Sequence, residues 1–220
     1  MIIFLVSSHI LMQNHKDYEE CQTSLQELKK EVIKKKKDTE EIDWERLKNI
    51  NKDVVGWIKI YNTNINYPIL QDTEELYYLN HTYKKMYNRN GSIFTLDKNL
   101  LRNERTIIYG HNMENKLMFS ELERYMNKNF FENHQKFNIY TENKKYEAII
   151  FSCYTITETK EKQNTENLDF DEEINYYKKM SKFSADNIEN ITKIVKLSTC
   201  SYTSSNKSQR YYIVAKVIEI

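Results

Sequence analysis

Residues 193–200, KIVKLSTC, and residues 210–219, RYYIVAKVIE, decide the fold. Both stretches are rich in β-branched and aromatic residues, which favour strands. The first ends on Cys200, and the second opens on Arg210, ten residues later. They therefore predict two strands whose ends carry chemically useful side chains.

Six earlier segments share this composition and are also predicted to be strands. They are residues 56–60, 65–70, 91–96, 105–110, 136–141 and 145–154. Eight short strands in about 160 residues, with few helices between them, favour a closed antiparallel or mixed barrel. The sequence therefore predicts a mostly β fold, an eight-stranded barrel.

Two segments between the strands have helical periodicity. Residues 117–126 and 168–182 each place large apolar residues on one face. The second lies in the long connection before the strand of Cys200. Long connections in compact barrels are usually functional, so we expect this inserted helix to cover something.

The chain before the barrel divides into two parts. Residues 1–12, MIIFLVSSHILM, are mostly apolar but too short to span a bilayer, which takes about 20 residues. We interpret them as a remnant of an N-terminal membrane anchor, the alternative being a buried or frayed terminus. Residues 13–52 are charged and predicted to be helical, with Asp43 as the N-cap of a second short helix. The barrel domain then occupies residues 53–220.

Composition excludes several classes of protein. Hydrophobic residues make up 40% of the 220, which is a globular composition. Lys and Arg number 33 against 32 Asp and Glu, so no net field points to nucleic acid. The three cysteines, Cys21, Cys153 and Cys200, form neither a disulfide framework nor a zinc spacing. We expect no metal and no cofactor.

Three residues form a candidate catalytic constellation. His111 ends the strand at 105–110, and in a barrel such an end can meet Cys200 and Arg210 on one rim. A thiol of pKa about 8.5 needs a cation or a base to become a nucleophile, and histidine supplies either. Arginine keeps its proton and suits an oxyanion or a substrate carbonyl. Gly110, just before His111, would let another backbone or a substrate approach closely.

Each of these residues also has an ordinary structural interpretation. A lone cysteine after a strand is usually a small buried hydrophobe. His111 could be a turn residue bonded to backbone, and Arg210 a surface residue paired with a carboxylate. Spacing and composition alone leave these alternatives open.

Local motifs around the three residues resemble the sortase family. Residues 197–200, LSTC, look like its TLxTC-type nucleophile strand, and residues 109–113, YGHNM, are similar to its histidine segment. Upstream blocks resemble class B in particular: VVGWIKI, NTNINYPILQ, YYLNH and GSIF, followed by the helical insertion at 168–182. The likeness covers about residues 44–220.

The sequence departs from the family pattern at two places. Lys196 precedes Leu197, where the family more often has Thr-Leu. The segment 74–79, EELYYL, stands where class B chains often have Asp-Asn before the Tyr-Leu pair.

The resemblance implies a cysteine transpeptidase with a sortase barrel and N-terminal helices. The Cys200 thiolate would attack the threonine carbonyl of a C-terminal NPxTN-like sorting motif and form a thioacyl enzyme. His111 would protonate the departing amide nitrogen, and Arg210 would hold the oxyanion or the motif backbone.

The resemblance also implies partners and a location. Surface proteins would be joined to an amine of the peptidoglycan stem or cross-bridge, by an extracellular domain held on the cell membrane by one N-terminal anchor. Ser198, Asn112 and Leu79 are the candidate substrate-binding residues.

Three other functions remain open at this point. One is a pilus-polymerising sortase. Another is a cysteine hydrolase or L,D-transpeptidase-like enzyme, although the Ser-x-Gly-Cys-x-Arg run of such transpeptidases is missing around Cys200. The third is a non-catalytic surface-binding barrel, which the many tyrosines would also suit.

Overall fold

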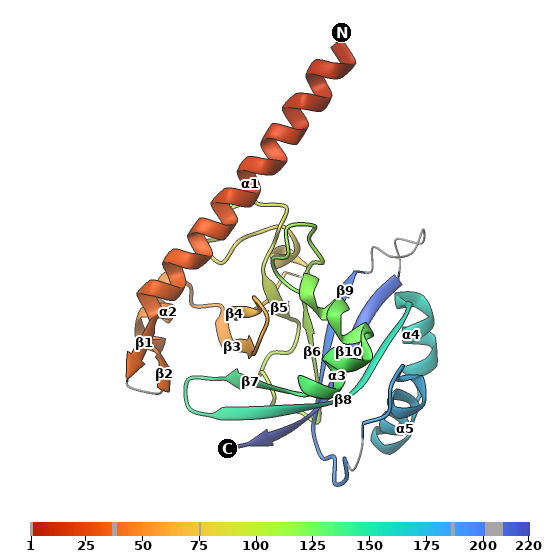
Figure 1. The fold of residues 1–220 in the computed structure, drawn as a ribbon. Helices are drawn as coiled ribbons and strands as arrows, with labels where there is room; N and C mark the ends of the chain where they lie inside the picture. The colour runs from red at the N-terminus through yellow and green to blue at the C-terminus, as the bar shows by residue number, and fades with distance from the viewer. Residues whose placement is uncertain (1, 37–38, 75, 186–187, 201–208) are drawn as a thin grey trace.

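Eight strands form the body of the protein, in a computed structural model that describes residues 2–36, 39–74, 76–185, 188–200 and 209–220. They close a barrel in the order β10-β8-β7-β3-β4-β5-β6-β9 (Figure 1). Their bounds are β3 Val54–Ile60, β4 Asn66–Gln71, β5 Ile93–Thr95, β6 Arg105–Tyr109, β7 Lys136–Tyr140, β8 Lys145–Thr157, β9 Ile194–Cys200 and β10 Gln209–Glu219. The predicted barrel of eight strands is confirmed.

Strand direction brings three chain segments to one rim. β6 pairs with β9 in parallel, with Tyr109 opposite Ser198, so both strands end at the same side of the barrel. β10 pairs with β9 antiparallel and places Arg210 opposite Cys200. The end of β6, the end of β9 and the start of β10 therefore share one edge. The pairing of β4 with β5 is also parallel, so of the two predicted forms, antiparallel and mixed, the barrel has the mixed one.

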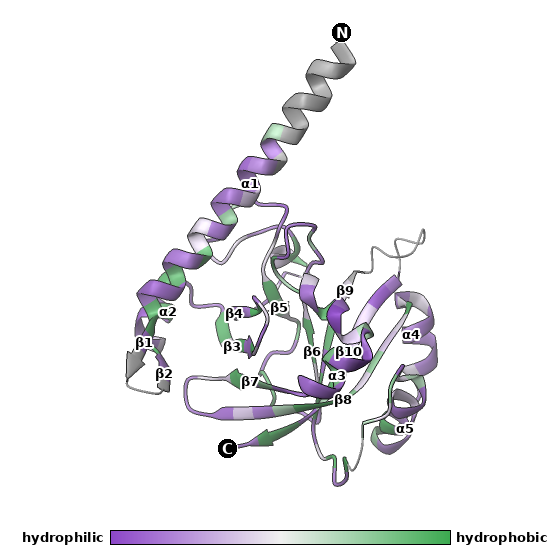
Figure 2. Ribbon diagram, viewed as in Figure 1, coloured by the Kyte–Doolittle hydropathy of each residue, from purple (hydrophilic) through white to green (hydrophobic). Residues whose placement is uncertain are grey.

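The barrel interior is a continuous apolar core. Its largest fully buried side chains include Trp57, Phe94, Phe119 and Phe137. Figure 2 shows the corresponding concentration of hydrophobic colour on the strands. Because each such side chain contributes about 1.5–3 kcal/mol when buried, the core supplies the rigidity on which the rim depends.

The N-terminal region packs on the barrel through one helix face. α1 (Ile2–Val32) is a long helix that leaves the body of the protein at its N-terminal half (Figure 1). Its C-terminal half buries Cys21, Leu25, Leu28 and Val32, the apolar stripe spaced at three and four residues. Among the helices that the structure describes, none is both long enough and apolar enough to cross a bilayer.

A hairpin interrupts the predicted helical region. β1 (Ile33–Lys36) and β2 (Thr39–Ile42) form a two-stranded antiparallel sheet, so the prediction of helix throughout residues 13–52 is wrong for this short piece. Lys34 lies opposite Glu41, and such opposite charges favour strand pairing. α2 (Trp44–Ile50) follows, and the Asp43 carboxylate accepts a hydrogen bond from the Arg46 amide at 3.0 Å, which confirms the predicted N-cap.

After the N-terminal region, the described helical segments lie in three connections between strands. The short 3-10 helix η1 (Tyr77–Leu79) lies between β4 and β5. After β6 come η2 (Ser120–Met126) and α3 (Lys128–Asn133). Between β8 and β9 lie α4 (Glu158–Thr165) and α5 (Phe170–Met180), side by side against the barrel (Figure 1). α5 is the helix predicted at 168–182, whereas α4 has no apolar stripe and was not predicted.

A buried ionic network joins α4 and α5 to strand β9. Lys196 projects from β9, and its ammonium lies 3.0 Å from the Glu161 carboxylate and 3.0 Å from the Tyr177 hydroxyl. Tyr154 donates to Glu161 at 2.6 Å, and Tyr176 donates to the other carboxylate oxygen at 3.0 Å. The side chains of Lys196 and Glu161 are only 8% and 4% exposed. The departure from the family motif at Lys196 is thus the cation of this network.

Lys196→Met should destabilise the fold. The change leaves the Glu161 carboxylate buried without its cation, which typically costs about 3–5 kcal/mol. Urea unfolding measures the free energy of unfolding. Lys160→Met, on the exposed side of α4, is the control and should change it by less than about 0.5 kcal/mol. The double variant Lys196→Met/Glu161→Met should recover most of the loss, since no unpaired charge remains. A single variant as stable as wild type would contradict the network's role.

Candidate functional site

The three predicted catalytic residues meet at one rim of the barrel. Continuing the parallel register of Tyr109 and Ser198 by two residues puts His111 level with Cys200. The Gly110 amide donates to the Ser198 carbonyl at 3.2 Å and extends this pairing beyond β6. Arg210 lies directly opposite Cys200 across the ladder. The backbone thus brings the three positions together, while the Cys200 thiol lies outside the described part of the structure.

The imidazole of His111 is oriented by a backbone carbonyl. Its Nε2 lies 2.6 Å from the Leu79 oxygen. A carbonyl only accepts, so Nε2 carries the proton and Nδ1 is the nitrogen that can exchange one in the neutral ring. Leu79 was predicted to bind substrate, which stays a prediction, and its main-chain carbonyl makes the contact with His111. Residue types give no signal for such a contact.

The electrostatic surroundings of His111 favour its neutral form. Burial is the largest effect and lowers the pKa of His111 below its usual range. The positive charge of Arg210 lowers this pKa further, whereas the hydrogen bond to Leu79 raises it. A neutral imidazole beside a thiol can act as a base and take its proton.

Arg210 is held at the rim by a carboxylate from the insertion. Its Nη2 donates to Glu158 at 2.9 Å, and its Nη1 donates to the Gln209 carbonyl at 3.3 Å. Glu158 is the first residue of α4. The carboxylate partner foreseen for a surface arginine is therefore present, yet Arg210 also lies close enough to influence the pKa of His111.

The segment that carries the Leu79 carbonyl is firmly anchored. Tyr78 is buried, and its hydroxyl donates to Asp53 at 2.6 Å and accepts from Asn51 at 2.9 Å. Its amide donates to Asp72 at 3.0 Å. These bonds hold Tyr78 at its hydroxyl and at its backbone amide. The acceptor of His111 is therefore held by residues from the β3 and β4 ends.

Gly91 leaves room for that carbonyl. Its φ is +57°, in the left-handed region, and a Cβ there would meet the Leu79 oxygen and lie 2.7 Å from the Tyr78 oxygen. Glycine alone combines this conformation with so close a backbone approach. At Gly110 the side chains of Ile93 and Phe119 fill the space that a Cβ would take.

The remaining predicted site residues lie beneath the rim. Ser198 and Asn112 are 5% and 3% exposed, and Asn112 follows His111 directly. Among the described residues, the Asn112 side-chain nitrogen and the Thr199 hydroxyl have no hydrogen-bond partner. A role of Ser198 and Asn112 in substrate binding stays a prediction.

The other two cysteines are poor nucleophiles. Burial raises the pKa of Cys21 to about 12 and that of Cys153 to about 11. The Cys153 thiol donates to the Tyr125 carbonyl at 3.3 Å inside the core. Since a thiolate is the reactive form, neither side chain is suited to attack a substrate.

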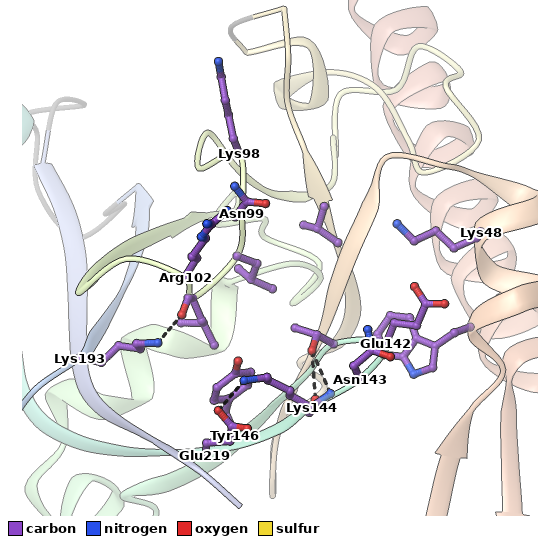
Figure 3. A pocket seen from close by; sticks show the side chains of 15 residues that line it. Lys48, Lys98, Asn99, Arg102, Glu142, Asn143, Lys144, Tyr146, Lys193 and Glu219 are labelled. Atoms are coloured by element: carbon purple, nitrogen blue, oxygen red, sulfur yellow. Dashed lines mark hydrogen bonds and ion pairs between the residues drawn. The ribbon is translucent and has the colours of Figure 1, made fainter.

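A basic pocket lies at the opposite rim, away from His111 and Arg210. It has a volume of about 470 Å³ and lies where β8 begins and β10 ends (Figure 3). Figure 3 shows Lys98 and Arg102 above it, with Lys144 paired to Glu219 and Lys193 bonded to backbone. The pocket contains none of the predicted catalytic residues. Within the described ranges, no cluster of His, Cys, Asp and Glu could hold a metal ion.

Gly91→Ala should displace the Leu79 carbonyl. The new Cβ meets that oxygen, so the variant should lose at least about 1 kcal/mol of unfolding free energy and lower the pKa of His111, whose hydrogen bond it weakens. Urea unfolding and NMR titration measure the two effects. Gly91→Asn separates the causes, because asparagine tolerates positive φ but still carries a Cβ. If Gly91→Asn keeps the wild-type stability and His111 pKa, the positive φ alone requires glycine at this position, and the contact of the Cβ with the Leu79 oxygen does not.

Arg210→Gln should raise the pKa of His111. A nearby cation disfavours the imidazolium, so removing it lets His111 hold its proton to higher pH. NMR titration of the His111 ring measures the shift directly. Lys216→Gln on the same strand, distant from the rim, is the control and should leave the titration unchanged. An unchanged or lower pKa in Arg210→Gln would contradict the coupling.

Known proteins with this sequence pattern and fold are sortases. A family model described as the sortase domain matches residues 58–218. Sortase B of Staphylococcus aureus is 34% identical over 217 residues, covering 94% of this chain and 86% of the relative. Sortase B of Listeria monocytogenes is 35% identical over 178 residues, covering 78% and 72%. The crystal structure of sortase B from B. anthracis superposes with a TM-score of 0.76 at 29% identity, covering 94% of this chain and all of that one. The chain therefore belongs to the sortase family of cysteine transpeptidases and is of the class B type.

Proposed function

We propose that Cys200 is the nucleophile of this transpeptidase, His111 its acid–base partner and Arg210 its oxyanion-binding residue. The observation that carries the proposal is the register of β6, β9 and β10, which gathers these three positions at one rim. The high pKa values of Cys21 and Cys153 support it by leaving Cys200 as the remaining thiol.

The first half-reaction forms a thioacyl enzyme. His111 takes the proton of the Cys200 thiol at Nδ1, and the thiolate attacks the carbonyl carbon of the scissile peptide. The negative charge that develops on the carbonyl oxygen is stabilised by Arg210, which stays protonated throughout. His111 then gives its proton to the departing amide nitrogen, the C–N bond breaks, and the thioester remains.

The second half-reaction reverses these roles. An amine attacks the thioester carbonyl carbon, and His111 accepts a proton from its nitrogen. The carbonyl re-forms, the C–S bond breaks, and the released Cys200 thiolate takes the proton back from His111. The same Arg210 charge stabilises the second oxyanion. The low pKa of His111 suits this cycle, because the ring has to release its proton readily in one step and accept one in the next.

Membership of the family supports a proposal for the substrates and the location. Class B sortases act on cell-wall surface proteins with sorting motifs. For this chain we propose a C-terminal NPxTN-like motif and an acceptor amine from the peptidoglycan stem or cross-bridge. The barrel of residues 53–220 would act outside the cell, carried by residues 13–52 with their helices and short hairpin, and residues 1–12 would be the remnant of a membrane anchor. Ser198, Asn112 and Leu79 would line or support the groove for the motif.

Cys200→Ala should abolish cleavage of an NPxTN-type peptide while the protein stays folded. Loss of the nucleophile should lower kcat/KM by at least about 10³-fold, and a fluorogenic peptide assay measures it. In wild type, a thiol probe should label one residue quickly at neutral pH and the other two only after unfolding. Cys21→Ala is the matched control and should keep full cleavage and fast labelling.

Two outcomes would redirect the proposal. If peptide turnover is the same with and without an added amine, and no amide product forms, the protein is a hydrolase under these conditions. If Cys200 in the folded protein neither reacts with the probe nor cleaves peptide, the catalytic assignment fails.

A further inference from the structure

Helix α4 presents two carboxylates to two different cations at the barrel surface. Glu158 pairs with Arg210 at 2.9 Å, and Glu161 pairs with Lys196 at 3.0 Å. The two acids are three positions apart on a helix, so they lie about one turn apart on neighbouring parts of its surface. α4 therefore bridges the rim residue Arg210 and the body of β9.

The buried contact between Lys196 and Glu161 fixes the position of α4. Lys196 and Glu161 are buried, and the Glu161 carboxylate also accepts hydrogen bonds from Tyr154 and Tyr176. A buried charge pair with satisfied hydrogen bonds has a defined geometry, because any displacement leaves a charge unpaired in the protein interior, where the dielectric constant is low. Lys196 lies on the same strand as Cys200, so α4 is fixed to the strand of the nucleophile.

The backbone brings Glu158 to Arg210 by a second route. β10 pairs with β8 so that Arg210 lies opposite Ile156 and Gln209 opposite Thr157. Glu158 follows these residues directly as β8 passes into α4. Thr157 is the N-cap of the helix and accepts a hydrogen bond from the Lys160 amide at 3.4 Å. No loop intervenes between the ladder and the carboxylate.

The exposed contact between Glu158 and Arg210 affects the orientation of the guanidinium more than the stability of the fold. The Glu158 side chain is 63% exposed, whereas that of Arg210 is 22% exposed. Exposed ion pairs contribute little to folding, so the pair is a weak fold constraint. A guanidinium has five donors in a rigid plane, so a bond through Nη2 sets the direction of that plane.

We propose that Glu158 is a positioning residue for Arg210. It holds the guanidinium in the orientation that stabilises the oxyanion during thioacyl formation, and the Lys196–Glu161 pair keeps α4 in the place from which it does so. The inference rests on the oxyanion role proposed above for Arg210. It assigns a function to the first turn of the insertion and to the lysine that departs from the family motif.

Glu158→Gln should lower kcat for peptide cleavage about tenfold and change KM by less than about twofold. Misorientation weakens a contact that matters most in the transition state, so the loss should appear in kcat. Glu166→Gln removes an exposed charge from the other end of α4, and Lys160→Met removes one from its exposed side. Both controls should retain wild-type kcat. Circular dichroism and urea unfolding check that all variants are folded.

A double variant tests whether Glu158 acts through Arg210. In an Arg210→Lys background, Glu158→Gln should cause no further loss of the residual turnover, since the guanidinium that Glu158 orients has been removed. A further tenfold loss there would overturn the inference. A wild-type kcat in Glu158→Gln, or an equal loss in Glu166→Gln, would overturn it too.

Failure of the catalytic assignment gives a different result. If Arg210→Lys alone keeps full turnover, Arg210 is not the oxyanion residue, and both statements fall. If Arg210→Lys loses turnover while Glu158→Gln does not, only the positioning role is refuted.

Discussion

The parallel pairing of β6 with β9 is the constraint on which the rest of the structure depends. Parallel strands end on the same side, so the residues that follow Tyr109 and Ser198 emerge at a common edge. Parallel neighbours need a long connection between them, and here the chain between β6 and β9 makes β7, β8 and four helical segments. The insertion that carries α4 and α5 is part of this connection. One pairing thus accounts both for the meeting of His111 with Cys200 and for the helices beside them.

At the rim, His111 is influenced by the charge of Arg210 and by the backbone carbonyl of Leu79. Arg210 lowers the pKa of His111, while the carbonyl of Leu79 holds the ring and raises it. The opposing effects are set by residues from separate segments, each anchored away from the rim. Tyr78 does this for Leu79 through Asp53 and Asn51, and α4 does it for Arg210 through Glu158. The reacting groups therefore depend on a surrounding shell that is mostly outside the barrel.

The sequence predicted those features that leave a hydrophobic pattern or a motif. All eight strand segments were predicted, because their β-branched and aromatic residues alternate or run together in the core. It missed α4, since residues 158–165 are polar throughout and their one buried anchor is Glu161. It also missed the hairpin of β1 and β2, whose pairing depends on opposite charges across strands. The contact of His111 with the Leu79 carbonyl had no sequence signal, because any residue supplies a carbonyl. Lys196 was noticed as a departure, but only its neighbours in space explain it.

The packing of α1 has a mechanical consequence. A helix of 31 residues extends roughly 45 Å at 1.5 Å per residue. Its C-terminal half is bound to the core by Cys21, Leu25, Leu28 and Val32, and the helix runs without a break from Ile2 to Val32. The barrel therefore moves with the helix as one rigid body. Any support that holds the far end of α1 also sets the direction in which the catalytic rim faces.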